Sequence, residues 1–153
     1  MSYKLKIERL IDAPPELVFD TMVDPEAQPE ILSGEVPGWA LWECAIDLRV
    51  GGKWTFVFGP ADRTGEPDRI TSVFIEIDRP HRFAYRSSMF IADWGRSVDF
   101  IETLSFEERD GETLVTLELT ELELEKDRDA FKSGVPGYLD AVARVVAGRV
   151  ANR

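Results

Sequence analysis

The chain has 153 residues, 44% of them hydrophobic and 31% charged, and its 29 acidic residues against 18 basic ones give a net charge of −11. This length and composition fit one folded domain with a sizeable core, so we expect a single domain over residues 1–153. The acidic balance argues against nucleic acid and membrane surfaces as partners, because both carry negative charge.

The first part of the chain predicts one strand and two short helices. Apolar and charged residues alternate over Tyr3–Ile11, which is typical of a half-buried strand. Pro15–Met22 fits a short helix with proline in its first turn. A second helix is predicted to start at Asp24-Pro25 and to be limited by Pro29, with a loop over residues 33–38 after it.

The middle of the chain predicts an antiparallel sheet. Strand-like segments separated by short turns cover residues 41–48, 53–58, 69–77, 82–88, 97–107 and 113–121. Gly51-Gly52 is predicted to be a tight hairpin turn, because glycine adopts the positive φ that such turns need. Alternation then places Trp54, Phe56 and Phe58 on one face of the next strand, which must be covered.

The C-terminal part predicts a long amphipathic helix that covers the sheet. Apolar residues follow helical spacing from about 127 to 150, with interruptions expected at Gly134 and Pro136-Gly137. The acidic run 121–127 before it fits a solvated strand end leading into a helix N-terminus, where negative charge is favourable. A partner-binding stripe is the alternative interpretation of this run.

Several segments, in this order, resemble one known family. They are residues 11–19, 21–26, 47–54, 76–83 and 137–139. Together they resemble the START-like (SRPBCC) superfamily, in particular the branch related to the C-terminal domain of activators of the heat-shock-protein-90 ATPase. The resemblance implies an α+β helix-grip fold: a curved six- to seven-stranded antiparallel sheet around a long C-terminal helix, with two short helices after the first strand. It also implies a mostly apolar cavity for a hydrophobic molecule.

Two positions depart from the pattern of that family. Residues 30–35 stand where many relatives carry a Trp-Trp pair, so the rim of the pocket differs. Gly137-Tyr138 replaces the usual Gly-Trp, and Tyr138 is expected to pack inward.

The candidate ligand-binding residues are mainly aromatic side chains predicted to face the cavity. They are Trp54, Phe56, Phe58, Phe83, Tyr85, Phe100, Glu102, Tyr138 and Val142. Apolar walls with few polar groups suit a flat or branched apolar ligand. The alternative is that these rings simply pack together as core.

Glu102 is the most informative single residue. Alternation places it on the same face as Phe100 and Leu104, so its carboxylate is predicted to point inward, whereas Asp99 is predicted to face water. A buried carboxylate finds partners, rises in pKa, or serves a ligand or a reaction. Glu102 is therefore a candidate catalytic residue, with a β-bulge that turns it to water, or an internal ion pair, as structural alternatives.

The rest of the sequence gives little support for metal, cofactor or covalent chemistry. His81 is the only histidine and lies in a predicted exposed turn, and Cys44 is predicted to be a small buried hydrophobe without a histidine partner. We therefore expect no metal and no cofactor. A single cysteine and no charged-then-apolar leader favour a cytoplasmic location.

Three classes of function fit these features. A carrier or sensor that buries a small hydrophobic molecule unchanged is favoured. The second is a small cyclase, dehydratase or hydrolase in which Glu102 or Tyr85 transfers a proton. The third is a chaperone-interaction module, although the chain is too short for the separate N-terminal domain of full-length activators. A homodimer is left open.

Overall fold

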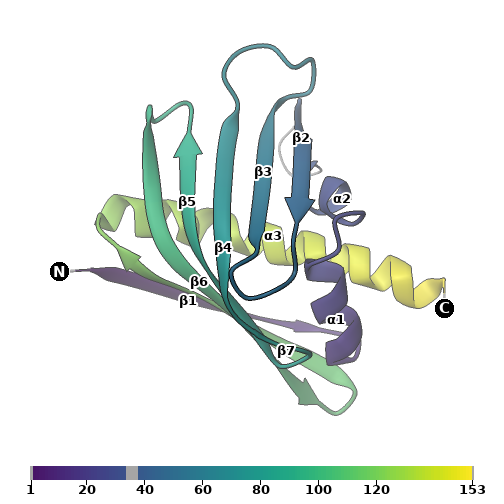
Figure 1. Ribbon diagram of the computed structural model, residues 1–153. Helices are drawn as coiled ribbons and strands as arrows, with labels where there is room; N and C mark the ends of the chain where they lie inside the picture. The colour runs from purple at the N-terminus through teal and green to yellow at the C-terminus, as the bar shows by residue number, and fades with distance from the viewer. Residues whose placement is uncertain (1, 34–37, 153) are drawn as a thin grey trace.

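The computed structural model describes residues 2–33 and 38–152 (Figure 1). The elements in chain order are β1 (Tyr3–Ile11), α1 (Pro15–Met22), α2 (Gln28–Ser33), β2 (Trp39–Ile46), β3 (Lys53–Pro60), β4 (Asp68–Asp78), β5 (Arg82–Ile91), β6 (Arg96–Arg109), β7 (Glu112–Leu122) and α3 (Glu125–Ala151). Seven strands form one antiparallel sheet in the order β1-β7-β6-β5-β4-β3-β2. The predicted helix-grip fold is confirmed.

The long helix α3 crosses behind the sheet, and strands β2 to β5 extend past it (Figure 1). Its backbone approaches β1, α1 and α2, and to a lesser degree β7. The backbone of α3 does not approach β3 to β5 as closely. How far the space between α3 and these strands is filled therefore depends on side chains. No helix in the described part of the chain is long and apolar enough to span a bilayer.

The connection between β2 and β3 differs from the predicted two-glycine turn. Strand β2 ends at Ile46, and residues 47–52 form a longer loop that bonds to β4, where Gly51 N donates to Phe74 O at 2.8 Å. Gly51 has the positive φ, +84°, that was expected of the turn. Glycine is needed at position 52 for a steric reason instead. A Cβ on Gly52 would lie 2.1 Å from the Asp47 carbonyl oxygen, so the loop closes only over a bare backbone.

Both proline-based predictions about helix ends are wrong. Helix α2 begins at Gln28, not at Asp24-Pro25, and Pro29 lies in its first turn, where a missing N–H leaves no helical bond unmade. The predicted loop 33–38 falls largely on residues 34–37, which lie outside the described residues. Helix α3 runs without a break through Gly134 and Pro136, and both positions are exposed.

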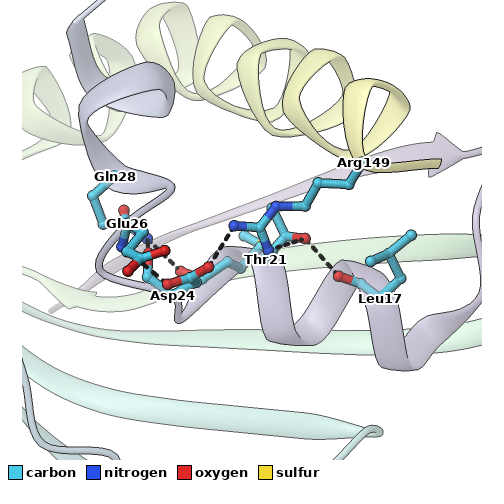
Figure 2. A network of polar contacts seen from close by, with 7 residues as sticks. Leu17, Thr21, Asp24, Glu26, Gln28 and Arg149 are labelled. Atoms are coloured by element: carbon cyan, nitrogen blue, oxygen red, sulfur yellow. Dashed lines mark hydrogen bonds and ion pairs between the residues drawn. The ribbon is translucent and has the colours of Figure 1, made fainter. Parts of the chain in front are cut away.

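A polar network fixes the C-terminal end of α3 to the α1–α2 connection (Figure 2). Arg149 donates to the Asp24 carboxylate and, at 3.2 Å, to Thr21 Oγ1, which in turn donates to Leu17 O at 2.7 Å. Gln28 Nε2 donates to the Asp24 carbonyl oxygen at 3.0 Å. Burial alone would raise the pKa of Asp24, but its hydrogen bond with Arg149 and the arginine's charge outweigh burial and lower that pKa below its usual value.

An ion pair fixes the other end of α3 to the start of β6. Arg96 donates two hydrogen bonds to Asp127, at 2.6 and 3.0 Å, and the Asp127 side chain is only 4% exposed. The guanidinium of Arg96 also lies 5.0 Å from the centre of the Trp94 ring. The expectation of a fully solvated acidic run is therefore wrong at Asp127, although Glu121, Glu123 and Glu125 are exposed.

Candidate functional site

Strand register arranges the concave side chains in rows that run across the sheet. The carboxyl row holds Phe74, Tyr85, Glu102 and Leu119. The serine row holds Trp54, Ser72, Ser87 and Phe100. The apolar row holds Cys44, Phe56, Ile70, Met89 and Val98. Each row lies closer than the last to the free ends of β2 to β5.

Exposure on the concave face is highest in the apolar row and at Glu102. Phe83 and Leu104, one step below the carboxyl row, are fully buried. In the apolar row, Cys44, Ile70 and Met89 are only half-buried, although they pack against the core. The protein thus leaves apolar surface of β2, β4 and β5 incompletely covered on its inner side, and this half-buried inner surface is called the recess below.

Glu102 lies in this recess and is hydrogen-bonded by Tyr85, whose hydroxyl donates to the carboxylate. Burial raises the pKa of Glu102 to about 8. The side chain is nevertheless half-buried rather than sealed. Protein thus surrounds the carboxyl group while part of the side chain stays accessible. At neutral pH its carboxyl group is therefore largely protonated.

Tyr138 brings the long helix into the same cluster. It is half-buried on α3, and burial together with the nearby charge of Glu102 raises the pKa of its phenol. The hydroxyl therefore stays a hydrogen-bond donor over the physiological range. Two tyrosines, one from β5 and one from α3, thus share a neighbourhood with one carboxyl group.

Aromatic rings form the wall beside this cluster. The ring centroid of Trp54 lies 5.6 Å from that of Tyr85 and 6.1 Å from that of Phe83. Trp54 is 2% exposed, and its indole Nε1 has no hydrogen-bond partner in the part of the chain that the structure describes. The thiol of Cys44 lies near that N–H, and burial raises the pKa of the thiol more than the N–H lowers it.

The comparisons with known proteins identify the family. Residues 12–147 match the family model described as activator of Hsp90 ATPase homolog 1-like protein (AHSA1). The chain belongs to this family. The AHSA1-like family is part of the SRPBCC, or START-like, superfamily, whose fold commonly binds hydrophobic ligands.

Solved structures show the same fold at low sequence identity. A protein from Chromobacterium violaceum matches with a TM-score of 0.77 and 21% identity, covering 94% of this chain and 96% of that one. A protein from Rhizobium leguminosarum gives 0.76 and 24%, covering 96% and 95%. An AHSA1-like protein from Aeromonas hydrophila gives 0.73 and 24%, covering 96% and 94%. No curated protein matches the sequence.

Within this AHSA1-like fold, the predicted site residues occupy different depths. Those that are buried are Trp54, Phe56, Phe83, Tyr85, Phe100 and Val142. Those that are half-buried are Phe58, Glu102 and Tyr138. Trp54, Phe56, Phe83 and Tyr85 pack on one another, while Phe100 contacts Phe131 of α3 with ring centroids 5.2 Å apart. Phe58 lies near the strand ends, 6.3 Å from the ring of Trp39.

Neither structural alternative for Glu102, a β-bulge or an internal ion pair, is found among the described residues. Strands β5 and β6 pair in regular register from Arg82 to Ile91, so no bulge turns Glu102 outward. Burial is the single cause of its raised pKa, so no cation in the described chain offsets it. Asp99 lies on the opposite face of β6 from Glu102 and is exposed, as predicted.

Sequence reasoning missed a polar pair on the floor of the recess. Ser72 and Ser87 are buried and share a hydrogen bond of 2.8 Å between their hydroxyl groups. The signal was present, because Ser72 has the same parity as Phe74, and Ser87 the same as Tyr85. One hydroxyl group donates this bond, and the hydroxyl group that accepts it still carries an O–H of its own.

Two surface grooves do not include Glu102. The larger, of about 960 Å³, lies beside the start of α3 and is lined in part by Ser87, Val98 and Phe100, and the other, of about 630 Å³, lies between α2 and the end of α3. Both are open to solvent, and their linings mix polar and apolar residues. His81 is exposed in the turn before β5, and the described residues hold no cluster of three or more metal-ligating side chains.

Proposed function

We propose that the protein binds a small hydrophobic molecule in the recess between the concave face of the sheet and α3, as a carrier or sensor. One observation supports this most: Cys44, Ile70 and Met89 of the apolar row are only half-buried although they face inward. Leaving such surface uncovered forgoes about 25 cal/mol of stabilisation per Å², and a ligand restores that burial. A few polar groups among apolar walls is the usual composition of a small-molecule site.

The proposal is tested by recovering or supplying the ligand. Native mass spectrometry of gently purified protein is expected to report a retained molecule. Thermal shift against a panel of apolar compounds is expected to raise Tm, because a ligand that binds only the folded state stabilises it. Ile70→Trp, which fills the recess from β4, is expected to remove the shift, while Val73→Trp on the exposed side of the same strand keeps it. A bare protein mass together with no shift for any compound would contradict the proposal.

A second candidate function is an enzyme that uses Glu102 as a general acid or base. The observation in its favour is the pKa of about 8 for a carboxyl group bonded to Tyr85, since proton-transfer groups work best near the operating pH. Turnover of a recovered ligand that is lost in Glu102→Gln with binding intact would support this candidate. Binding without any turnover would leave the carrier or sensor.

A further inference from the structure

The carboxyl group of Glu102 has aromatic and apolar neighbours but no positive partner. Tyr85 faces it from β5 and Tyr138 from α3, while β7 presents Leu119 and β4 presents Phe74 in the same row. No cation among the described residues offsets its burial.

Two arginines on the strands beside Glu102 are paired with other carboxylates. Arg96 at the start of β6 holds Asp127, and Arg86 on the outer side of β5 pairs with Glu121. Asp127 is nearly buried, so Arg96 is committed to it and does not serve Glu102. Among the described residues, none therefore supplies a positive charge beside Glu102, and a bound ligand could.

The rings around Glu102 suit such a charge. Tyr85 and Trp54 are in contact, and Phe100 lies on the same face of β6 as Glu102 and two residues before it. The faces of aromatic rings attract cations, most strongly where water is excluded. An anionic ligand would meet the opposite conditions, because the chain carries a net charge of −11 and the recess already disfavours one negative charge.

We propose that the recess selects hydrophobic ammonium compounds, with the positive group held by the Glu102 carboxylate beside the rings of Tyr85 and Tyr138. This inference rests on the proposed function and names its ligand class. A neutral ligand gains at most a hydrogen bond from Glu102, whereas a cation supplies the ion-pair partner that the carboxyl group lacks. The apolar row then takes the hydrocarbon part of the ligand.

Binding of this kind is coupled to loss of a proton. Glu102 is mostly protonated at pH 7, because its pKa is about 8, and it must ionise to pair with a cation. Tyr138, the titratable group that faces it from α3, stays neutral because its own pKa is raised. A permanently charged ligand is therefore expected to bind about tenfold more tightly per pH unit up to pH 8 and then to reach a plateau.

The test compares three probes of equal chain length on the full chain. Decyltrimethylammonium, decanol and decanoate are titrated by calorimetry from pH 6 to 9, below the concentrations at which they form micelles. At pH 8.5 the ammonium probe is expected to bind at least tenfold more tightly than decanol, and decanoate more weakly than both. Repeating the titration at pH 7 in buffers of different ionisation enthalpy is expected to show the release of nearly one proton per ammonium bound.

Two variants locate the effect. Glu102→Gln is expected to lose the ammonium preference and its pH dependence while still binding decanol. Asp99→Asn removes the same charge from the exposed side of the same strand and is expected to keep both. Proton release is measured on the wild-type protein. It therefore tests whether ammonium binding requires ionisation even if Glu102→Gln folds poorly.

The outcomes separate this inference from the proposed function. Decanol binding as tightly as the ammonium probe at every pH would overturn the inference and leave the proposed function standing. Failure of all three probes, with no retained molecule in native mass spectrometry, would overturn both. An ammonium preference that persists in Glu102→Gln would assign the effect to the acidic surface and overturn the inference.

Discussion

At the scale of single residues, the two most informative carboxyl groups face opposite conditions. Asp127 is nearly buried and holds a bidentate arginine. Glu102 is enclosed with a tyrosine as its hydrogen-bond partner and no cation, so burial raises its pKa to about 8. The first arrangement stabilises the fold and the second costs stability whenever the carboxyl group is ionised.

Glu102→Gln is expected to change the pH dependence of stability. The folded protein keeps the Glu102 proton up to about pH 8, whereas the unfolded chain releases it near the ordinary value of 4.5. The folded state thus binds more protons between these values, and wild-type stability falls as pH rises through this window. Relative to Glu102→Gln, the free energy of unfolding of the wild type should fall by up to about 4 kcal/mol from pH 5 to 8.

Urea unfolding at several pH values measures this difference. Asp99→Asn serves as the control, because Asp99 is exposed on the other face of β6. A constant difference between wild type and Glu102→Gln across the window would show that Glu102 is solvated.

Arg96→Ala is expected to destabilise the protein by about 3 kcal/mol, because it leaves the nearly buried Asp127 without its partner. Arg86→Ala is the matched control, since the Arg86–Glu121 pair is more than half exposed and such pairs contribute less than about 1 kcal/mol. Chemical denaturation of both variants gives the comparison. Equal losses would mean that the Arg96–Asp127 pair is no more than a surface contact.

At the scale of elements, backbone geometry decides what a glycine does. Gly134 lies in the middle of α3, exposed, and a Cβ there would meet no atom within 4 Å. Gly111, in the turn between β6 and β7, has a φ of +86°, which side chains strain. The same substitution at the two sites therefore has opposite effects.

Gly134→Ala is expected to stabilise the protein by about 0.5 to 1 kcal/mol, because alanine loses less conformational freedom in a helix interior. Gly111→Ala is expected to destabilise it by about 1 kcal/mol. Thermal unfolding of both variants checks the signs. A loss of stability in Gly134→Ala would show that α3 does not continue as a regular helix through this position.

The elements were largely predictable from the sequence because their signals are local. Alternation in β1 and in β6 fixed both the strands and the inward direction of Glu102. The errors came from residues whose effect depends on context. Pro29 was expected to limit α2 and Pro136 to interrupt α3, but proline is harmless in a first turn, and α3 continues through Pro136 even though an interior proline removes one helical hydrogen bond. The partner of Asp127 could not be foreseen, since Arg96 is distant in the sequence and alternation does not reveal which arginine lies opposite.

At the scale of the whole molecule, the sheet has two unlike halves. β1, β6 and β7 pack with α1 and α3 over fully buried residues such as Leu104, Leu117 and Leu139. The free ends of β2 to β5 carry half-buried apolar side chains instead. Local stability is expected to follow this division, because exposed hydrogen bonds with few buried contacts open more readily.

Hydrogen exchange followed by mass spectrometry is expected to show this division. In the unliganded protein, β2 and the end of β3 near Phe58 should exchange well before β6 and β7. A bound ligand should slow exchange in β2 to β5 more than in β1 and β7. Uniform protection across the sheet, unchanged by ligand, would contradict a recess on that side.

The two attachments of α3 restrict the route by which a ligand could enter and leave. The helix is tied to β6 through Arg96 and Asp127, and to the α1–α2 connection through Arg149 and Asp24, at opposite ends of its length. An outward displacement of either end of α3 would require breaking one of these two ion pairs. If the proposed ligand binds, we therefore expect it to enter between the free ends of β2 to β5, past residues such as Leu41 and Phe58.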